Sequence, residues 1–138
     1  MSSAHPDPAA TRAIFQAVVL SALADGSVPR SEAEVVDQML KLDERFVHIA
    51  DAFDLAVAVR VLLDAHGIEG ALEQIVVDLT DAADHVTTFR LCARIILADG
   101  KTEGEEAMVL GTLQELFGLS IADVRAALEA ERERKTRS

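Results

Sequence analysis

The hydrophobic positions along the chain recur with the period of an α-helix. In residues 15–23, and again in residues 89–97, apolar side chains fall at i, i+3, i+4, i+7 and i+8. This spacing places them on one face of a helix, which can then pack against a core. No segment alternates between apolar and polar residues for long enough to form a sheet. The pattern therefore predicts an all-α protein.

These two segments belong to a repeat with an offset of 74 residues. The sequence Leu-Ala-Asp-Gly at residues 23–26 recurs at residues 97–100. In each copy an amphipathic segment ends at Gly26 or Gly100, and a second helical segment follows almost at once. Glycine commonly adopts the left-handed conformation that ends a helix. We therefore expect two pseudo-symmetric helix hairpins.

Further start and stop signals complete the set of helices. Residues suited to helix N-termini occur at three places: Pro29, Thr102 with Glu105, and Ser120 with Asp123. Between the hairpins, residues 51–67 form a strongly apolar helical segment that should end near Gly67, and residues 71–83 form another. We expect one compact bundle of six or seven helices over residues 11–130. A disordered N-terminus should precede it at residues 1–10, and a frayed, solvated tail should follow at residues 131–138.

Composition and charge exclude several kinds of partner. The chain has 138 residues, enough for one domain, and carries a net charge of -11 with neither Trp nor Tyr. Such a chain repels phosphate backbones and lacks the usual aromatic residues for stacking on bases, so we expect no nucleic-acid partner. No apolar stretch is long enough for membrane insertion. The acidic excess instead suits a basic protein partner or a hard cation.

The single cysteine, Cys92, cannot form an internal disulfide and falls on an apolar helical face. It is therefore expected in the core of a protein from a reducing compartment, and we expect a cytoplasmic location.

The two aspartates of the repeat are the main candidates for chemistry. Asp25 and Asp99 each follow an apolar helical segment, where the helix dipole disfavours a negative charge. Each could fold forward and accept hydrogen bonds from free backbone N–H groups at the start of the next helix. Alternatively, pseudo-twofold packing could bring the two together, with Glu32 or Glu106 completing a site for calcium, magnesium or manganese.

Other possible sites are weaker. Asp-Gly-x5-Glu matches the second half of a calcium-binding EF-hand loop, but the expected earlier ligand positions hold Ser21 and Leu23, then Ile95 and Leu97. Asp81 and His85, spaced i, i+4 in an acidic stretch, are expected to form a solvated helical pair. No glycine-rich phosphate loop, nucleophile elbow or Cys-x-x-Cys pair occurs, and we expect no enzymatic activity.

The doubled Ala-Asp-Gly turn, each copy followed by a Glu-containing helical segment, and the closing LQELFGLS together resemble the TerB-like domains of bacterial tellurite-resistance proteins. The resemblance covers about residues 15–128. It implies an all-helical cytoplasmic domain tied to tellurite resistance and stress response, with no established catalytic activity. Metal binding at the acidic turns would carry over to Asp25 and Asp99, and less directly to Glu32 and Glu106.

The sequence thus indicates a non-enzymatic interaction module of the TerB-like, stress-response type, with a candidate divalent-cation site at its two Asp-Gly turns. The alternative is a metal-independent adapter that docks a basic partner on its acidic surface and uses the aspartates only as caps.

Overall fold

The computed structural model describes residues 8–24, 31–98 and 105–137, and the elements within these ranges are all helical. Its elements are α1 (Pro8–Leu23), α2 (Glu32–Leu40), the short 3-10 helix η1 (Glu44–His48), α3 (Ala52–Ile75), α4 (Ala82–Ala98), α5 (Glu105–Phe117) and α6 (Ile121–Arg137). For this part of the chain the all-α prediction is confirmed. Helix α1 begins at Pro8, so the expected boundary at residue 11 falls inside a helix. Proline suits a first helical position because its missing N–H has no helical partner there.

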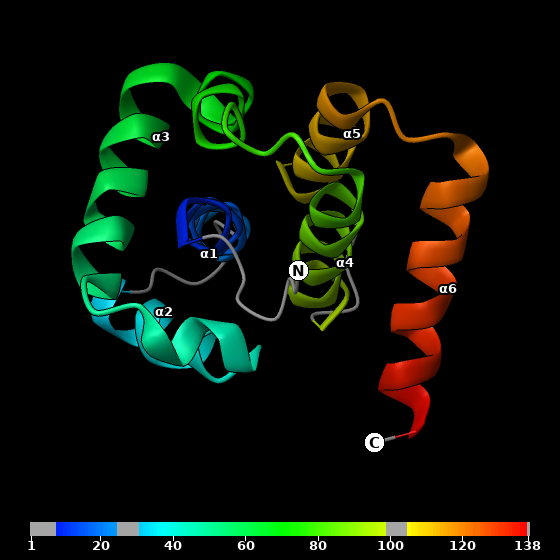
Figure 1. The fold of residues 1–138 in the computed structure, drawn as a ribbon, viewed down its shortest axis with the longest axis horizontal. Helices are drawn as coiled ribbons and strands as arrows, with labels where there is room; N and C mark the ends of the chain where they lie inside the picture. The colour runs from blue at the N-terminus through cyan, green and yellow to red at the C-terminus, as the bar shows by residue number, and fades with distance from the viewer. Residues whose placement is uncertain (1–7, 25–30, 99–104, 138) are drawn as a thin grey trace, which may run out of the picture.

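Helix α1 is the centre of the bundle (Figure 1). It contacts α2, η1, α3 and α4, and its sequence is apolar on almost every side. A helix without a polar face is stable only when other elements cover it. Phe15 is fully buried, and its ring meets that of Phe46 from η1 edge to face, with centroids 5.2 Å apart. The core is therefore built around α1.

Helix α3 changes direction at Gly67 (Figure 1). The backbone of Gly67 has φ 74° and ψ -178°, a combination that is essentially restricted to glycine. The expected helix end near Gly67 is confirmed. The next segment differs from the expectation of residues 71–83, because α3 resumes after Gly67 and ends at Ile75, before α4 begins at Ala82.

The start of α2 also differs from the expectation. The Ser31 hydroxyl accepts a hydrogen bond from the Glu34 backbone N–H at 3.2 Å, and the Glu34 carboxylate accepts one from the Ser31 N–H at 3.1 Å. This reciprocal pair is a capping box, so α2 begins at Glu32. Pro29, which was expected at the first helical position, lies outside the described residues, and the described helix has Ser31 as its cap.

The connection from α5 to α6 follows the sequence signals. Gly118 has φ 64°, and the Leu119 N–H donates to the Gln114 carbonyl at 3.0 Å, as in a glycine-terminated helix. The Asp123 N–H then donates to the Ser120 hydroxyl at 3.0 Å, while the Ser120 N–H donates to the Asp123 carboxylate at 3.3 Å. The predicted capping start of α6 is confirmed.

Helix α6 lies at the outside of the bundle and packs on α4 (Figure 1). Most of its described side chains are exposed, but Ala127 and Glu131 are buried. The helix continues to Arg137. The expectation of a frayed tail from residue 131 needs correction, because Glu131 is held against α4 by two arginines.

Candidate functional site

The four acidic residues proposed as cation ligands are not placed together by any described contact. Asp25 and Asp99 lie outside the described residues. Glu32 is the first residue of α2 and Glu106 the second of α5, but their side chains also lie outside the description. Within the described ranges, no group of three or more His, Cys, Asp or Glu residues could hold a metal ion. The cation site remains a prediction.

A cavity of about 540 Å³ lies beside the end of α1. It is lined by Ala24, which directly follows α1, by Arg60 and Asp64 of α3, and by Met108 near the start of α5. Arg60 and Asp64 are spaced i, i+4, so one cation and one carboxylate face the same space. Ala24 directly precedes Asp25 in the sequence.

A second hollow, of about 490 Å³, lies between the start of α1 and the segment before α3. Its cationic residues are largely paired with acids. Arg12 donates to Asp51 at 2.5 Å, and Arg45 donates to Asp43 at 3.0 Å. The hydrogen bond from Arg12 lowers the pKa of Asp51, and the same bond raises the pKa of Arg12. These pairs neutralise the charges that would attract an anionic ligand.

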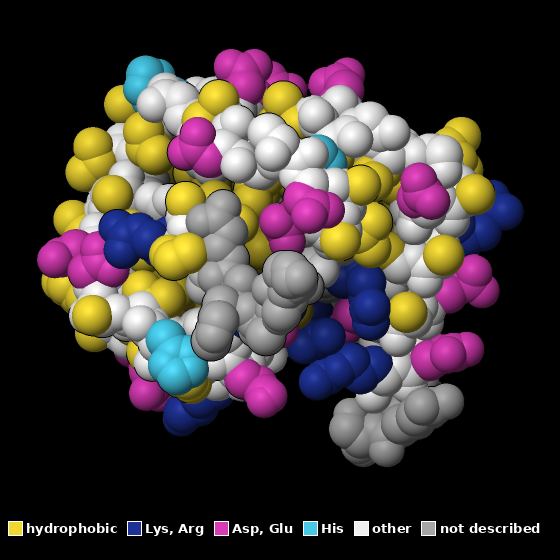
Figure 2. Space-filling view, viewed as in Figure 1, with side chains coloured by type: hydrophobic (Ala, Val, Ile, Leu, Met, Phe, Trp, Pro, Cys, Tyr) yellow, Lys and Arg dark blue, Asp and Glu magenta, His cyan; other side chains and the backbone are white. Residues whose placement is uncertain are grey.

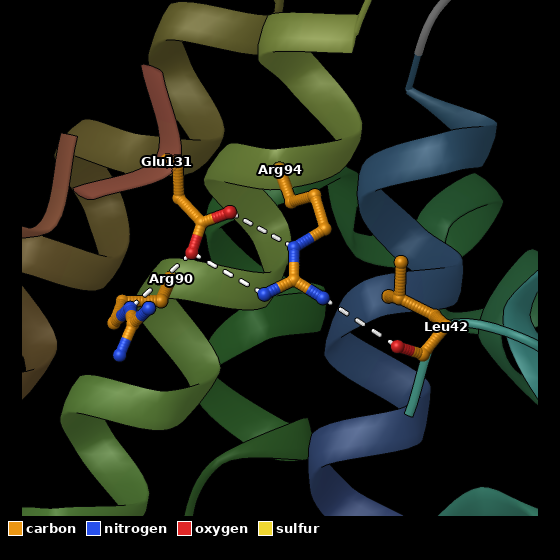
Figure 3. Close-up of polar contacts among 4 residues, drawn as sticks. All are labelled: Leu42, Arg90, Arg94 and Glu131. Atoms are coloured by element: carbon orange, nitrogen blue, oxygen red, sulfur yellow. Dashed lines mark hydrogen bonds and ion pairs between the residues drawn. The ribbon is translucent and has the colours of Figure 1, made fainter. Parts of the chain in front are cut away.

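The most developed polar cluster joins α6 to α4 (Figure 3). The Glu131 side chain is only 1% exposed and receives hydrogen bonds from Arg94 Nε at 2.9 Å, Arg94 Nη2 at 3.4 Å and Arg90 Nε at 3.2 Å. Arg94 Nη1 also donates to the Leu42 carbonyl at 3.5 Å. We call these four residues the Glu131 cluster. It ties α6, α4 and the segment after α2 together.

The Glu131 cluster is a closed structural contact. Both oxygens of the carboxylate accept charge-assisted hydrogen bonds, which are stronger than neutral ones. Glu131 was expected in a solvated tail, and this contact was not predicted. A signal was present, because Val124, Ala127, Leu128 and Glu131 have the i, i+3, i+4, i+7 spacing of one helical face. Glu131 thus continues the buried stripe of α6.

His85 does not form the expected pair with Asp81. Its Nε2 donates to the Leu79 carbonyl at 2.6 Å, and its ring stacks on Phe117 with centroids 4.1 Å apart. The Asp81 carboxylate instead accepts a hydrogen bond from the Ala83 N–H at 2.9 Å, at the start of α4. The predicted pair was wrong because Asp81 precedes the helix and caps it.

Cys92 of α4 lies in the core, as expected. Burial raises the pKa of its thiol to about 12, while a hydrogen bond with Ser21 of α1 acts in the opposite direction. A thiol with so high a pKa carries almost no thiolate near neutral pH. Cys92 is therefore unsuited to act as a nucleophile.

Comparisons with protein-family models, with curated proteins and with solved structures find no match to this chain. Among the helices described here, none is long and apolar enough to cross a membrane.

Proposed function

We propose that this protein is a non-enzymatic interaction module of the TerB-like, stress-response type. One structural observation carries the interaction role: Phe53, Val57 and Val61 form an exposed apolar row on α3 of a chain with net charge -11. Contiguous exposed apolar surface commonly marks a site of protein association. The TerB-like assignment itself rests on the doubled Ala-Asp-Gly turn of the sequence.

The proposal includes a pseudo-symmetric arrangement of two hairpins, α1 with α2 and α4 with α5. Each of these pairs is in contact, and α1 also contacts α4. A cytoplasmic location is part of the same proposal, and the lone, buried Cys92 suits it.

Growth on tellurite tests the stress role directly. Cells that lack the gene should be more sensitive to tellurite than cells that carry it, and the wild-type gene should restore growth. Equal growth of the two strains would contradict a role in tellurite resistance. An indirect role is expected, because tellurite is an anion and this acidic protein repels anions.

Binding of a divalent cation at Asp25, Asp99, Glu32 and Glu106 is the second part of the proposal. The observation that favours it is the cavity beside Ala24, which contributes a further carboxylate from Asp64. Calcium, magnesium and manganese are the candidates because all the ligands would be oxygens. Arg60 lines the same cavity and would compete with a cation for nearby carboxylates.

Thermal unfolding of chelator-treated protein, with and without each cation, distinguishes this site from simple caps. A cation at a hundred times its dissociation constant should stabilise the wild type by about 2.7 kcal/mol. The double variant Asp25→Asn, Asp99→Asn should lose this shift. If no cation shifts the wild type and the variant is only less stable, the aspartates are caps. The protein is then a metal-independent adapter that docks a basic partner on its acidic surface.

A further inference from the structure

Helix α3 carries an apolar row on the side that faces away from the core. Phe53, Val57 and Val61 are spaced four residues apart and are 51%, 39% and 60% exposed. Leu55 and Val59, on the opposite side of the helix, are buried. We call the three exposed residues the α3 ridge. Figure 2 shows hydrophobic side chains along the edge of the molecule that α3 forms, with acidic side chains and a Lys or Arg side chain among them.

The charges beside the α3 ridge are mainly negative. Asp54 and Asp64 are exposed on the same helix, within one turn of the ridge. Arg60 of the same helix is half-buried, and both Arg60 and Asp64 line the cavity between α1, α3 and α5. A surface of this kind attracts positive charge around an apolar centre.

We propose that the α3 ridge docks an amphipathic helix of a partner protein that carries Lys or Arg on both sides of its apolar stripe. An apolar stripe packs between the ridge side chains, as in helix-to-helix packing, and the flanking cations meet Asp54 and Asp64. This inference rests on the proposed role as an interaction module. It adds the surface and the class of partner.

Charge decides between this partner and other occupants. A second copy of the chain has the same net charge of -11 and would bring its own Asp54 and Asp64 to the interface. Like charges placed together oppose such an association. An anionic membrane is repelled for the same reason. A basic helix is the occupant that complements both the apolar and the acidic parts of the surface.

The test measures binding of a labelled synthetic helix with leucines on one stripe and lysines on both flanks, by fluorescence anisotropy. Val61→Asp should weaken binding by about tenfold or more, because it places a charge in the apolar centre. Val77→Asp is the matched control: it makes the same charge change at a residue that is 69% exposed and lies after the end of α3. It should leave the affinity within about twofold of wild type.

A second variant tests the acidic border without altering the ridge. Asp54→Asn combined with Asp64→Asn should weaken binding by about twofold to fivefold and reduce its dependence on salt, as expected for charges at the rim of an interface. A probe with glutamates in place of lysines should bind less tightly to wild type than the lysine probe. Circular dichroism and thermal unfolding check that every variant keeps the native fold.

Several outcomes would overturn the proposal. These are absence of binding to wild type, equal binding by wild type and Val61→Asp, or equal binding of the lysine and glutamate probes. Sedimentation equilibrium adds another: a dimer that Val61→Asp dissociates would make a second copy the occupant. If Val61→Asp retains binding, the module binds basic helices elsewhere and only the ridge assignment fails. The tellurite growth test fails or succeeds independently of the probe.

Discussion

Helix α4 lies between α1 and α6 and binds the two in different ways (Figure 1). Toward α1 it presents Cys92, which is fully buried next to Ser21. Toward α6 it presents Arg90 and Arg94, which hold the carboxylate of Glu131. The first interface belongs to the apolar core, whereas the second combines a narrow apolar stripe with an ion-pair cluster.

The difference shows that similar helix lengths conceal different sources of stability. Helix α1 has 16 residues and α6 has 17, yet α1 is covered by four other elements and α6 packs chiefly on one. Burial of apolar area is non-directional, so α1 is held from several sides at once. Helix α6 depends on a few directional contacts, and their loss should release it locally while the rest of the bundle remains folded.

The largest effect is expected in the core around α1. Phe15→Ala should lower the free energy of unfolding by about 3–5 kcal/mol, because it leaves a cavity at a fully buried ring that contacts Phe46. Urea unfolding measures the change. Leu128→Ala on α6 is the comparison, and its cost should be smaller because Leu128 is only partly buried. Equal costs would show that α6 belongs to the same core as α1.

Removal of the charge at Glu131 should have the next largest effect. Glu131→Gln should cost about 1–3 kcal/mol, since it weakens hydrogen bonds between charged groups. The solvent access of Arg90 and Arg94 limits the cost, because water can hydrate both guanidinium groups. Hydrogen exchange should become faster in α6 and remain unchanged in α1. Glu133→Gln, at an exposed position on α6, should change stability by less than about 0.5 kcal/mol. If Glu131→Gln changes the stability as little as Glu133→Gln does, the Glu131 cluster does not stabilise the protein.

Alkaline pH should test the interface between α4 and α1. Burial raises the pKa of Cys92 from 9.0 to about 12, so its contribution to stability is complete below pH 9 and is lost as the pH rises toward 12. Between pH 9 and pH 12 the free energy of unfolding should fall by about 1.4 kcal/mol per pH unit. The chain has no tyrosine to titrate in the same interval. The stability difference between wild type and Cys92→Ala should therefore narrow with rising pH in urea unfolding. If the stability difference between wild type and Cys92→Ala stays constant as the pH rises, burial does not raise the pKa of this thiol.

The smallest effect is expected for the ion pair between Arg12 and Asp51, which also joins an arginine to a carboxylate but is well exposed. Asp51→Asn should destabilise the protein less than Glu131→Gln, because water screens an exposed pair. The hydrogen bond from Arg12 lowers the pKa of Asp51 below 3.8. The stabilisation by this ion pair is therefore present above pH 3.8 and is lost as the pH falls through the lowered pKa of Asp51. The free energies of unfolding of wild type and Asp51→Asn should therefore converge as the pH is lowered. A difference between them that grows in acid would contradict the ion pair between Arg12 and Asp51.

Apolar periodicity and glycine positions predicted most of the fold. The helical class, the helix break at Gly67 and the capped start of α6 at Ser120 follow from local chemistry that the sequence displays. Errors arose where two local signals competed. Pro29 and Ser31 could both start a helix, and the hydroxyl of Ser31 forms the cap. Asp81 could pair with His85 or cap α4, and it caps.

The candidate site was harder to predict because it depends on distant residues. The repeated sequence context singles out Asp25 and Asp99. Whether two such residues lie close together depends on how distant helices pack, which no local pattern specifies. The Glu131 cluster joins residues about forty positions apart, and no local pattern pairs Glu131 with Arg90 and Arg94. The periodicity of α6 could indicate only that Glu131 faces inward.

The turn of α3 at Gly67 also bears on how this protein can diverge in evolution. Because its φ of 74° and ψ of -178° are strained for every residue with a Cβ atom, substitution there should cost about 1–3 kcal/mol even though a Cβ would meet no neighbouring atom. Surface and core residues can change in compensating pairs, but a backbone restriction of this kind has no compensating partner. Position 67 should therefore stay glycine in descendants that keep this fold, and it offers a fixed point for aligning distant relatives.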